Sequence, residues 1–278
     1  MTLLAPKTYL RLSDHLVLRR MWGLALRHLF LYRESWPRLF EMMYWPIINI
    51  SLFGFISLSM VQRFGHTDIL TETYLGGLLL AELLTRTVMA FLVMYMEEVW
   101  SRNLGHLFAS PVRIRDYVGS LMILSATRCL IAIVPAYVIA YFLFNFSILS
   151  LGWALPLYGA LLCFNGWWYG IMIISLLMRF GLAAEWLGWM GTWVLMPFMA
   201  PYYPVSILPH AFQIISWTLP GTYVFECMKQ QMVSGSINYS YLAISAGLNV
   251  LYLILACVIF SRSYLSAQNL GGLLQMGE

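Results

Sequence analysis

The sequence contains few charged residues: they make up 10% of its 278 positions, against roughly a quarter in a typical soluble domain. Hydrophobic residues make up 61% and aromatic residues 16%. A water-soluble core of this size cannot bury so much apolar surface, and exposed apolar patches would cause aggregation. The scarcity of charge therefore excludes a soluble, disordered or secreted disulfide-rich protein. It predicts a chain whose solvent is largely lipid.

Lysine is nearly absent, and the two lysines, Lys7 and Lys229, follow Pro6 and Met228. A phosphate-binding P-loop needs a Gly-Lys pair, so this chain cannot carry one. The HExxH and GxSxG motifs of zinc proteases and serine hydrolases are also missing. The four cysteines have no CxxC spacing, which argues against a metal site or a disulfide framework. We therefore expect no catalytic residue, metal or cofactor in this chain.

Long apolar runs are what the sequence does have. A helix that crosses a bilayer needs about 20 mostly apolar residues, and six segments meet this need: 39–60, 72–96, 117–144, 153–178, 184–200 and 239–261. Three prolines, Pro204, Pro209 and Pro220, break the stretch 201–238 into pieces shorter than a span. We expect one or two short re-entrant helices there, on the outer face between spans 5 and 6. The fold class predicted is an all-α integral membrane protein with six transmembrane helices.

The positions of the basic residues predict the orientation. Residues 16–33 mix apolar residues with four arginines, a pattern typical of an amphipathic helix lying along the membrane surface; a short basic flank to the first span is the alternative. With the N-terminus inside, only Arg63 and Lys229 fall outside. Twelve basic residues fall on the cytoplasmic side: Lys7, Arg11, Arg19, Arg20, Arg27, Arg33, Arg38, Arg102, Arg113, Arg115, Arg179 and Arg262. The positive-inside rule then places both termini in the cytoplasm. We expect one domain over 1–278, with tails at 1–38 and 262–278 around a core at 39–261.

The cytoplasmic loop after the second span, Glu97 to Tyr117, is charged at its edges and apolar in its middle. Leu107 and Phe108 provide an apolar knob, and Pro111 ends the segment. A short helix of this kind at the membrane surface suits docking into a partner's groove. An ordinary amphipathic turn is the alternative.

The loop resembles the coupling-helix region of ABC type-2 exporter permeases, which has acidic residues, a basic residue, an apolar pair and Ser-Pro-Val before the third span. The stretches Tyr203-Pro-Val-Ser-Ile-Leu-Pro209 and Leu219-Pro-Gly-Thr-Tyr-Val-Phe-Glu226 resemble that family's outer segment between the last two spans. The order and spacing of these motifs extend the resemblance over nearly the whole chain. One departure lies at Gly221 and around Cys227, where many relatives carry arginine; Lys229 is the candidate substitute.

This resemblance implies a half-transporter. Two permease chains, identical or paired with a relative, would form the path for a lipid-linked, glycan or hydrophobic substrate exported across the inner or plasma membrane. Two separate P-loop ATPase subunits would bind ATP and Mg²⁺; membrane lipid is the other expected partner, and nucleic acid is not one. Seven residues would form the contact with the ATPase: Glu98, Arg102, His106, Leu107, Phe108, Pro111 and Arg113.

Three charged residues lie well inside the expected spans, away from their ends. Glu82 and Arg86 are one helical turn apart in the second span, and Arg128 lies deep in the third. Each uncompensated charge at the bilayer centre costs roughly 2.5–3.5 kcal/mol on insertion scales, so we expect the three to face protein or water and to pair with one another. They form either a polar patch on the path or dimer interface, or a structural ion pair.

Tryptophans are the other candidates for the path. Trp186, Trp189 and Trp193 fall on one helix face, while Trp167 and Trp168 fall in the middle of the fourth span. Their rings would suit a sugar or an amphipathic substrate in a channel, and packing against neighbouring helices is the alternative. Gly166 and Gly170 form a GxxxG pattern that lets another helix approach closely.

Two other functions compete with the permease. The chain could be the membrane anchor of a respiratory or biosynthetic complex, but its five histidines all fall outside the expected spans, which disfavours a haem held within the bilayer. It could also be an ion-coupled carrier that uses Glu82 and Arg86, in which case transport would survive ATP depletion.

Overall fold

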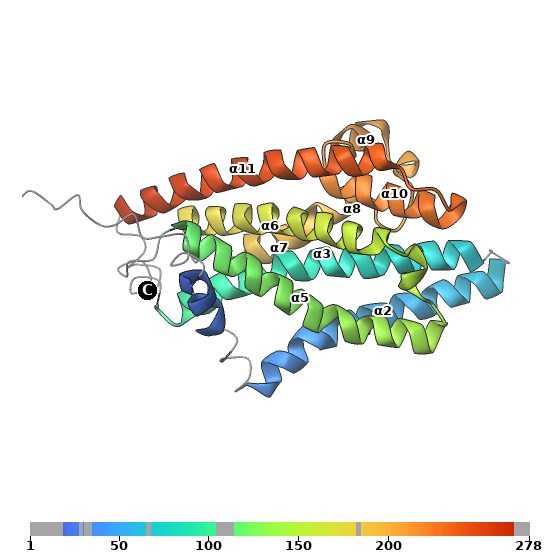
Figure 1. The fold of residues 1–278 in the computed structure, drawn as a ribbon, viewed down its shortest axis with the longest axis horizontal. Helices are drawn as coiled ribbons and strands as arrows, with labels where there is room; N and C mark the ends of the chain where they lie inside the picture. Colours follow the sequence, from blue (N-terminus) through green and yellow to red (C-terminus); the bar gives the residue numbers. More distant parts are fainter. Residues whose placement is uncertain are drawn as a thin grey trace, which may run out of the picture.

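The computed structural model describes residues 19–27, 30, 35–64, 68–103, 114–181 and 185–269, and these segments are helical apart from short turns. Among these described residues, five helices are long and apolar enough to cross a bilayer: α2 (Trp36–Phe64), α3 (Asp68–Trp100), α5 (Ile114–Phe144), α6 (Ala154–Phe180) and α11 (Tyr239–Asn269). They run lengthwise in one bundle (Figure 1). The expected all-α membrane protein is therefore confirmed, and each of these helices covers one of the expected spans.

The expected span 184–200 is shorter and interrupted in the structure. It consists of α7 (Glu185–Val194) and the four-residue α8 (Met196–Met199), with a turn at Leu195 between them. Pro197 has no N–H to continue the hydrogen bonds of α7, and Ala200 ends α8 with a left-handed φ of 50°. At 1.5 Å per residue α7 is roughly 15 Å long, about half of a bilayer's hydrocarbon core.

The stretch 201–238 contains three short helices: η3 (Val205–Ile207), α9 (His210–Ser216) and α10 (Pro220–Ser234). Pro204, Pro209 and Pro220 each stand at a helix start, where a missing N–H costs nothing. These helices gather with α8 at the end of the bundle where α11 begins, which we call the Tyr239 end (Figure 1). The opposite end, where α3 ends, α5 begins and α6 ends, we call the Trp100 end.

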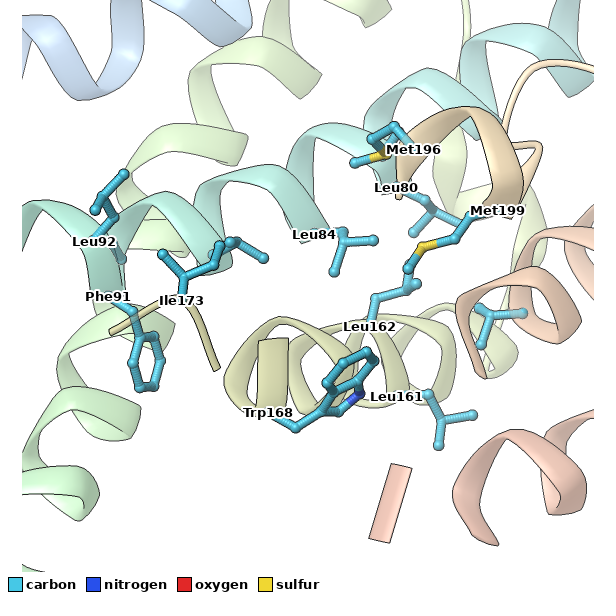
Figure 2. Close-up of a cluster of buried hydrophobic side chains, with 14 of the residues drawn as sticks. Leu80, Leu84, Phe91, Leu92, Leu161, Leu162, Trp168, Ile173, Met196 and Met199 are labelled. Carbon is cyan, nitrogen blue, oxygen red and sulfur yellow. The ribbon is translucent and has the colours of Figure 1, made fainter. Parts of the chain in front are cut away.

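The core lies along α3 and α6, which pack against each other, while α11 covers the other side of α6. Figure 2 shows the leucines of α3 facing those of α6, with Met196 and Met199 of α8 beside them. The close fit of α3 and α6 depends on glycine. A Cβ at Gly166 would lie 2.6 Å from Thr87 Cβ, and one at Gly170 would lie 2.7 Å from Phe91 Cβ. Gly166 and Gly170 therefore lie in the contact surface between these two helices.

Candidate functional site

The described part of the loop after α3 begins with a tight helix end. Arg102 adopts a left-handed φ of 54°, its N–H bonds to the carbonyl of Val99 at 2.9 Å, and the N–H of Asn103 bonds to the carbonyl of Glu98 at 3.0 Å. This pair of bonds is the Schellman arrangement that ends many helices, here with arginine at the position glycine usually occupies. It turns the chain away from α3 and leaves the Arg102 side chain exposed.

Ion pairs connect both ends of this loop to the N-terminal part of the chain. Glu98 is 1% exposed and pairs with Arg27 through both of its oxygens at 3.2 Å, and Asn103 donates to the same carboxylate at 2.5 Å. Asp116, at the start of α5, is fully buried and pairs with Arg20 at 3.5 Å. Both arginines lie on the helical segment 19–27. This segment is therefore bound to the end of α3 and to the start of α5.

A third ion pair joins the beginning of α2 to the same place: Arg38 lies 3.7 Å from Glu97. We call these six residues the ion-pair cluster: Arg20, Arg27, Arg38, Glu97, Glu98 and Asp116. The three acids lie at the Trp100 end of α3 and α5, and the three bases come from the first 38 residues. Buried carboxylates are stable only with such partners, so the cluster fixes the relative positions of segment 19–27, α2, α3 and α5.

Among the seven expected coupling residues, Glu98 and Arg102 are described. Glu98 faces segment 19–27, whereas Arg102 is exposed. His106, Leu107, Phe108, Pro111 and Arg113 fall in 104–113, outside the described residues. Sequence reasoning missed the ion-pair cluster because it assigned Glu98 to the contact with the ATPase, and Arg20 and Arg27 to a helix on the membrane surface. The sequence did contain one signal: the acids of this loop and the arginines of the first 38 residues are expected on the same side of the membrane, where they can pair.

The expected intramembrane pair is present. Arg86 Nε lies 3.1 Å from a Glu82 oxygen, and Asn49 of α2 donates to the other Glu82 oxygen at 2.6 Å. Glu82 is 4% exposed, so both oxygens of a buried carboxylate have partners. Arg128 lies on the same cavity as Arg86, together with Glu41 and Trp189. The contribution of Asn49 was not anticipated, because nothing in the sequence indicates which faces of α2 and α3 meet.

The five tryptophans take different positions. The indole of Trp168 is buried and donates to Asn249 of α11 at 3.0 Å, and that of Trp167 donates to Ser125 of α5 at 3.0 Å. Both therefore link α6 to a neighbouring helix. Trp189 lines the cavity of Arg86, whereas Trp186 and Trp193 are 57% and 44% exposed.

At the Tyr239 end, Lys229 holds the turn that follows α8. Its ammonium donates to the carbonyl of Ala200 at 2.9 Å, to the carbonyl of Tyr203 at 2.6 Å and to Glu226 at 2.6 Å. Glu226 in turn accepts from the N–H of Val205 at 3.0 Å. Burial lowers the pKa of Lys229, and pairing with Glu226 offsets this only in part. Lys229 is thus the positive charge that organises this segment.

Replacing Lys229 with methionine should lower the free energy of unfolding by about 2–4 kcal/mol, because two carbonyls and a carboxylate lose their shared donor. Thermal unfolding in detergent measures the effect. Gln230→Met is the matched control, since Gln230 is exposed on the same helix and its side chain makes a single bond of 3.3 Å. Lys229→Met unfolding at the wild-type temperature would show that the turn does not depend on this charge.

Comparison with known proteins supports the family resemblance that the sequence motifs indicated. The family model described as ABC-2 type transporter matches residues 24–233, which include α2 to α10 and the loop bounded by the ion-pair cluster. A search of curated proteins finds no match to the chain. The matched region is well over half of the sequence, and it contains the motifs on which the resemblance was based. The chain therefore belongs to the ABC-2 type transporter family and is a membrane permease of an ABC transporter.

Proposed function

We propose that the chain is the membrane-spanning half of an ABC exporter, which moves a lipid-linked, glycan or hydrophobic substrate outward from the cytoplasmic side. ATP and Mg²⁺ bind to a separate P-loop ATPase subunit, present in two copies. A second permease chain, identical or related, completes the path in the inner or plasma membrane. The family assignment supports the permease and its ATPase partner; the direction and the substrate class are our proposals.

The topology we propose has six spans and both termini in the cytoplasm. In Figure 1, α6 ends at the Trp100 end and α11 starts from the opposite one, so the chain must return between Phe180 and Tyr239. The helices α7 and α8 run in that direction (Figure 1), and we assign the fifth span to them. The Trp100 end is then cytoplasmic, in agreement with the twelve basic residues counted on that side. The helices η3, α9 and α10 would lie at the outer face.

The observation that carries the proposal is the ion-pair cluster. Its two most buried acids, Glu98 and Asp116, lie on either side of the loop that connects α3 to α5, and each pairs with an arginine of segment 19–27. This loop is the one expected to dock on the ATPase. A displacement of the loop by an ATPase would therefore move α3, α5 and segment 19–27 together, and α2 with them through Arg38. ATP binding can drive such a movement only if it favours one of the two states, as closure of an ATPase pair would. In this account Glu98 positions the loop, while Leu107 and Phe108 contact the partner.

Replacing Leu107 and Phe108 with serine should abolish co-purification of a P-loop ATPase with the chain and remove the vanadate-sensitive ATP hydrolysis of the preparation. The reason is that an apolar knob supplies most of the binding free energy at such a small interface. Quantitative mass spectrometry and a phosphate-release assay measure the two effects.

The matched control replaces Ile207 and Ile214 with serine. These side chains are 69% and 59% exposed at the Tyr239 end, and the change should leave ATPase binding intact. Transport by the purified chain in the complete absence of an ATPase would overturn the proposal.

A further inference from the structure

The cavity at Arg86 differs in character from the rest of the bundle. It has a volume of about 110 Å³ and lies where α2, α3, α5 and α7 meet. Its charged lining residues are Glu41, Arg86 and Arg128, and its aromatic ones are Trp45 and Trp189. Two arginines beside aromatic walls, at a level where the surrounding helices are apolar, need an explanation beyond packing.

Arg86 brings unused hydrogen-bond donors to this cavity. A guanidinium has five N–H donors, and the Arg86 side chain uses one, its Nε, on Glu82. The other oxygen of Glu82 accepts from Asn49. Within the part of the chain that the structure describes, the terminal nitrogens of Arg86 bond to no other residue, and the side chain keeps 14% exposure. The terminal nitrogens of an arginine can bind a phosphate through two parallel N–H···O hydrogen bonds.

The two arginines lie at the same depth. Arg86 precedes the last residue of α3 by fourteen positions, and Arg128 follows the first residue of α5 by fourteen. At 1.5 Å per residue, both are roughly 21 Å along their helices from the Trp100 end. On α3 the lining residues Arg86, Met89 and Val93 share one face. The site is therefore one level of the bundle, with two cations on neighbouring helices.

The size and the walls of the cavity limit what can bind. A volume of about 110 Å³ is that of a few water molecules, each of which takes about 30 Å³, so one compact group fits and a sugar chain does not. Met42, Met89 and the indole of Trp45 beside it suit a hydrocarbon tail. Exposed Glu41 opposes an anion, so its charge should weaken binding.

We propose that this cavity binds the phosphate group of an amphiphile, with Arg86 and Arg128 as its ligands. This deepens the proposed function and depends on it: the substrate class would be a phosphate-bearing lipid or lipid-linked molecule, held at the phosphate while the rest of it lies in the path or the membrane. Glu82 and Asn49 orient Arg86 by fixing its Nε, so that its outer nitrogens point to the cavity.

The test uses the permease purified with its ATPase in a maltoside detergent, which carries no phosphate. Dodecyl phosphate is the probe, and the ligand-dependent rise in Tm gives the affinity. We expect dodecyl phosphate to stabilise the complex, and dodecanol or inorganic phosphate alone to have no effect. Equal stabilisation by dodecanol, or by inorganic phosphate, would overturn the proposal, because it would show apolar partitioning or a free-anion site.

Four variants locate the site. Arg128→Gln and the double variant Glu82→Gln with Arg86→Gln, which leaves no uncompensated carboxylate, should each weaken dodecyl phosphate binding at least about tenfold. Glu41→Gln should strengthen it by about threefold, because a repelling charge is removed. Arg63→Gln, an exposed arginine at the end of α2, is the control and should bind as the wild type does. Unchanged binding in the arginine variants would overturn the proposal.

ATP hydrolysis and ATPase content, measured on the same samples, separate this proposal from the function on which it rests. Unchanged binding in the arginine variants of an intact, ATP-hydrolysing complex would overturn the phosphate site and leave the exporter in place. A wild-type chain that never retains an ATPase would overturn the exporter, whatever it binds.

Discussion

Arg27→Ala should lower the free energy of unfolding by about 2–4 kcal/mol and should uncouple ATP hydrolysis from transport. The variant leaves the carboxylate of Glu98, which is 1% exposed, without its cation, and an uncompensated buried charge is among the most destabilising changes known. The loss should fall short of the largest values, because Asn103 still donates to Glu98 and Arg27 itself is 43% exposed. Thermal unfolding in detergent measures the first effect, and ATP consumed per substrate moved measures the second.

Arg19→Ala is the matched control for this prediction. Arg19 is an exposed arginine on the same helical segment, and no residue that the structure describes bonds to it. Its removal should leave the Tm unchanged. The charge-reversed double variant Arg27→Glu with Glu98→Arg should recover part of the lost stability. If the Arg27→Ala and Arg19→Ala variants have the same Tm, the ion-pair cluster does not hold segment 19–27 against the loop.

Gly170→Ala should lower the free energy of unfolding by about 2–3 kcal/mol, and Gly166→Ala by a similar amount. The new methyl groups would lie 2.7 Å from Phe91 Cβ and 2.6 Å from Thr87 Cβ. These neighbouring atoms are attached directly to the backbone of α3, so no side-chain rotation relieves the contact and the two helices must separate. Thermal unfolding in detergent again gives the measurement.

Gly247→Ala provides the control, because a Cβ at this position of α11 meets no atom within 4 Å. Alanine in an open helical position restricts the unfolded chain, so this variant should be neutral or more stable by about 0.5–1 kcal/mol. The comparison holds the chemistry of the substitution constant and changes only the space around it. Equal stability of Gly170→Ala and Gly247→Ala would show that α3 and α6 do not require glycine to pack.

The elements that the sequence predicts well depend on local information. The apolar runs predict the five long helices, and the i,i+4 spacing predicts the ion pair between Glu82 and Arg86. The prolines predict the short helices before α11. The continuity of 184–200 was wrong because a single proline, Pro197, breaks the helix within an otherwise apolar run. A hydropathy average over the segment does not register a single proline, but the missing N–H of that proline interrupts the hydrogen bonds of the helix.

The contacts that the sequence does not predict join residues far apart along the chain. The hydrogen bond between Arg27 and Glu98 joins residues 71 positions apart in the sequence. The bond between Trp168 and Asn249 spans 81 positions, and the bond between Asn49 and Glu82 spans 33. No periodicity within one helix shows which face meets which neighbour, so these partners require the packed bundle. The expected orientation limits the possible partners of Glu98 to the basic residues on the same side of the membrane, but it does not single out Arg27. The same limit applies to the phosphate site, whose two arginines come from different helices.

Native mass spectrometry of the chain, extracted from its own membrane, tests the central claim most directly. The account predicts one assembly that contains two permease chains and two copies of a P-loop ATPase, and that loses the ATPase when Leu107 and Phe108 are replaced by serine. An assembly without any ATPase, or one that pairs the chain with redox or biosynthetic subunits in its place, would contradict the account.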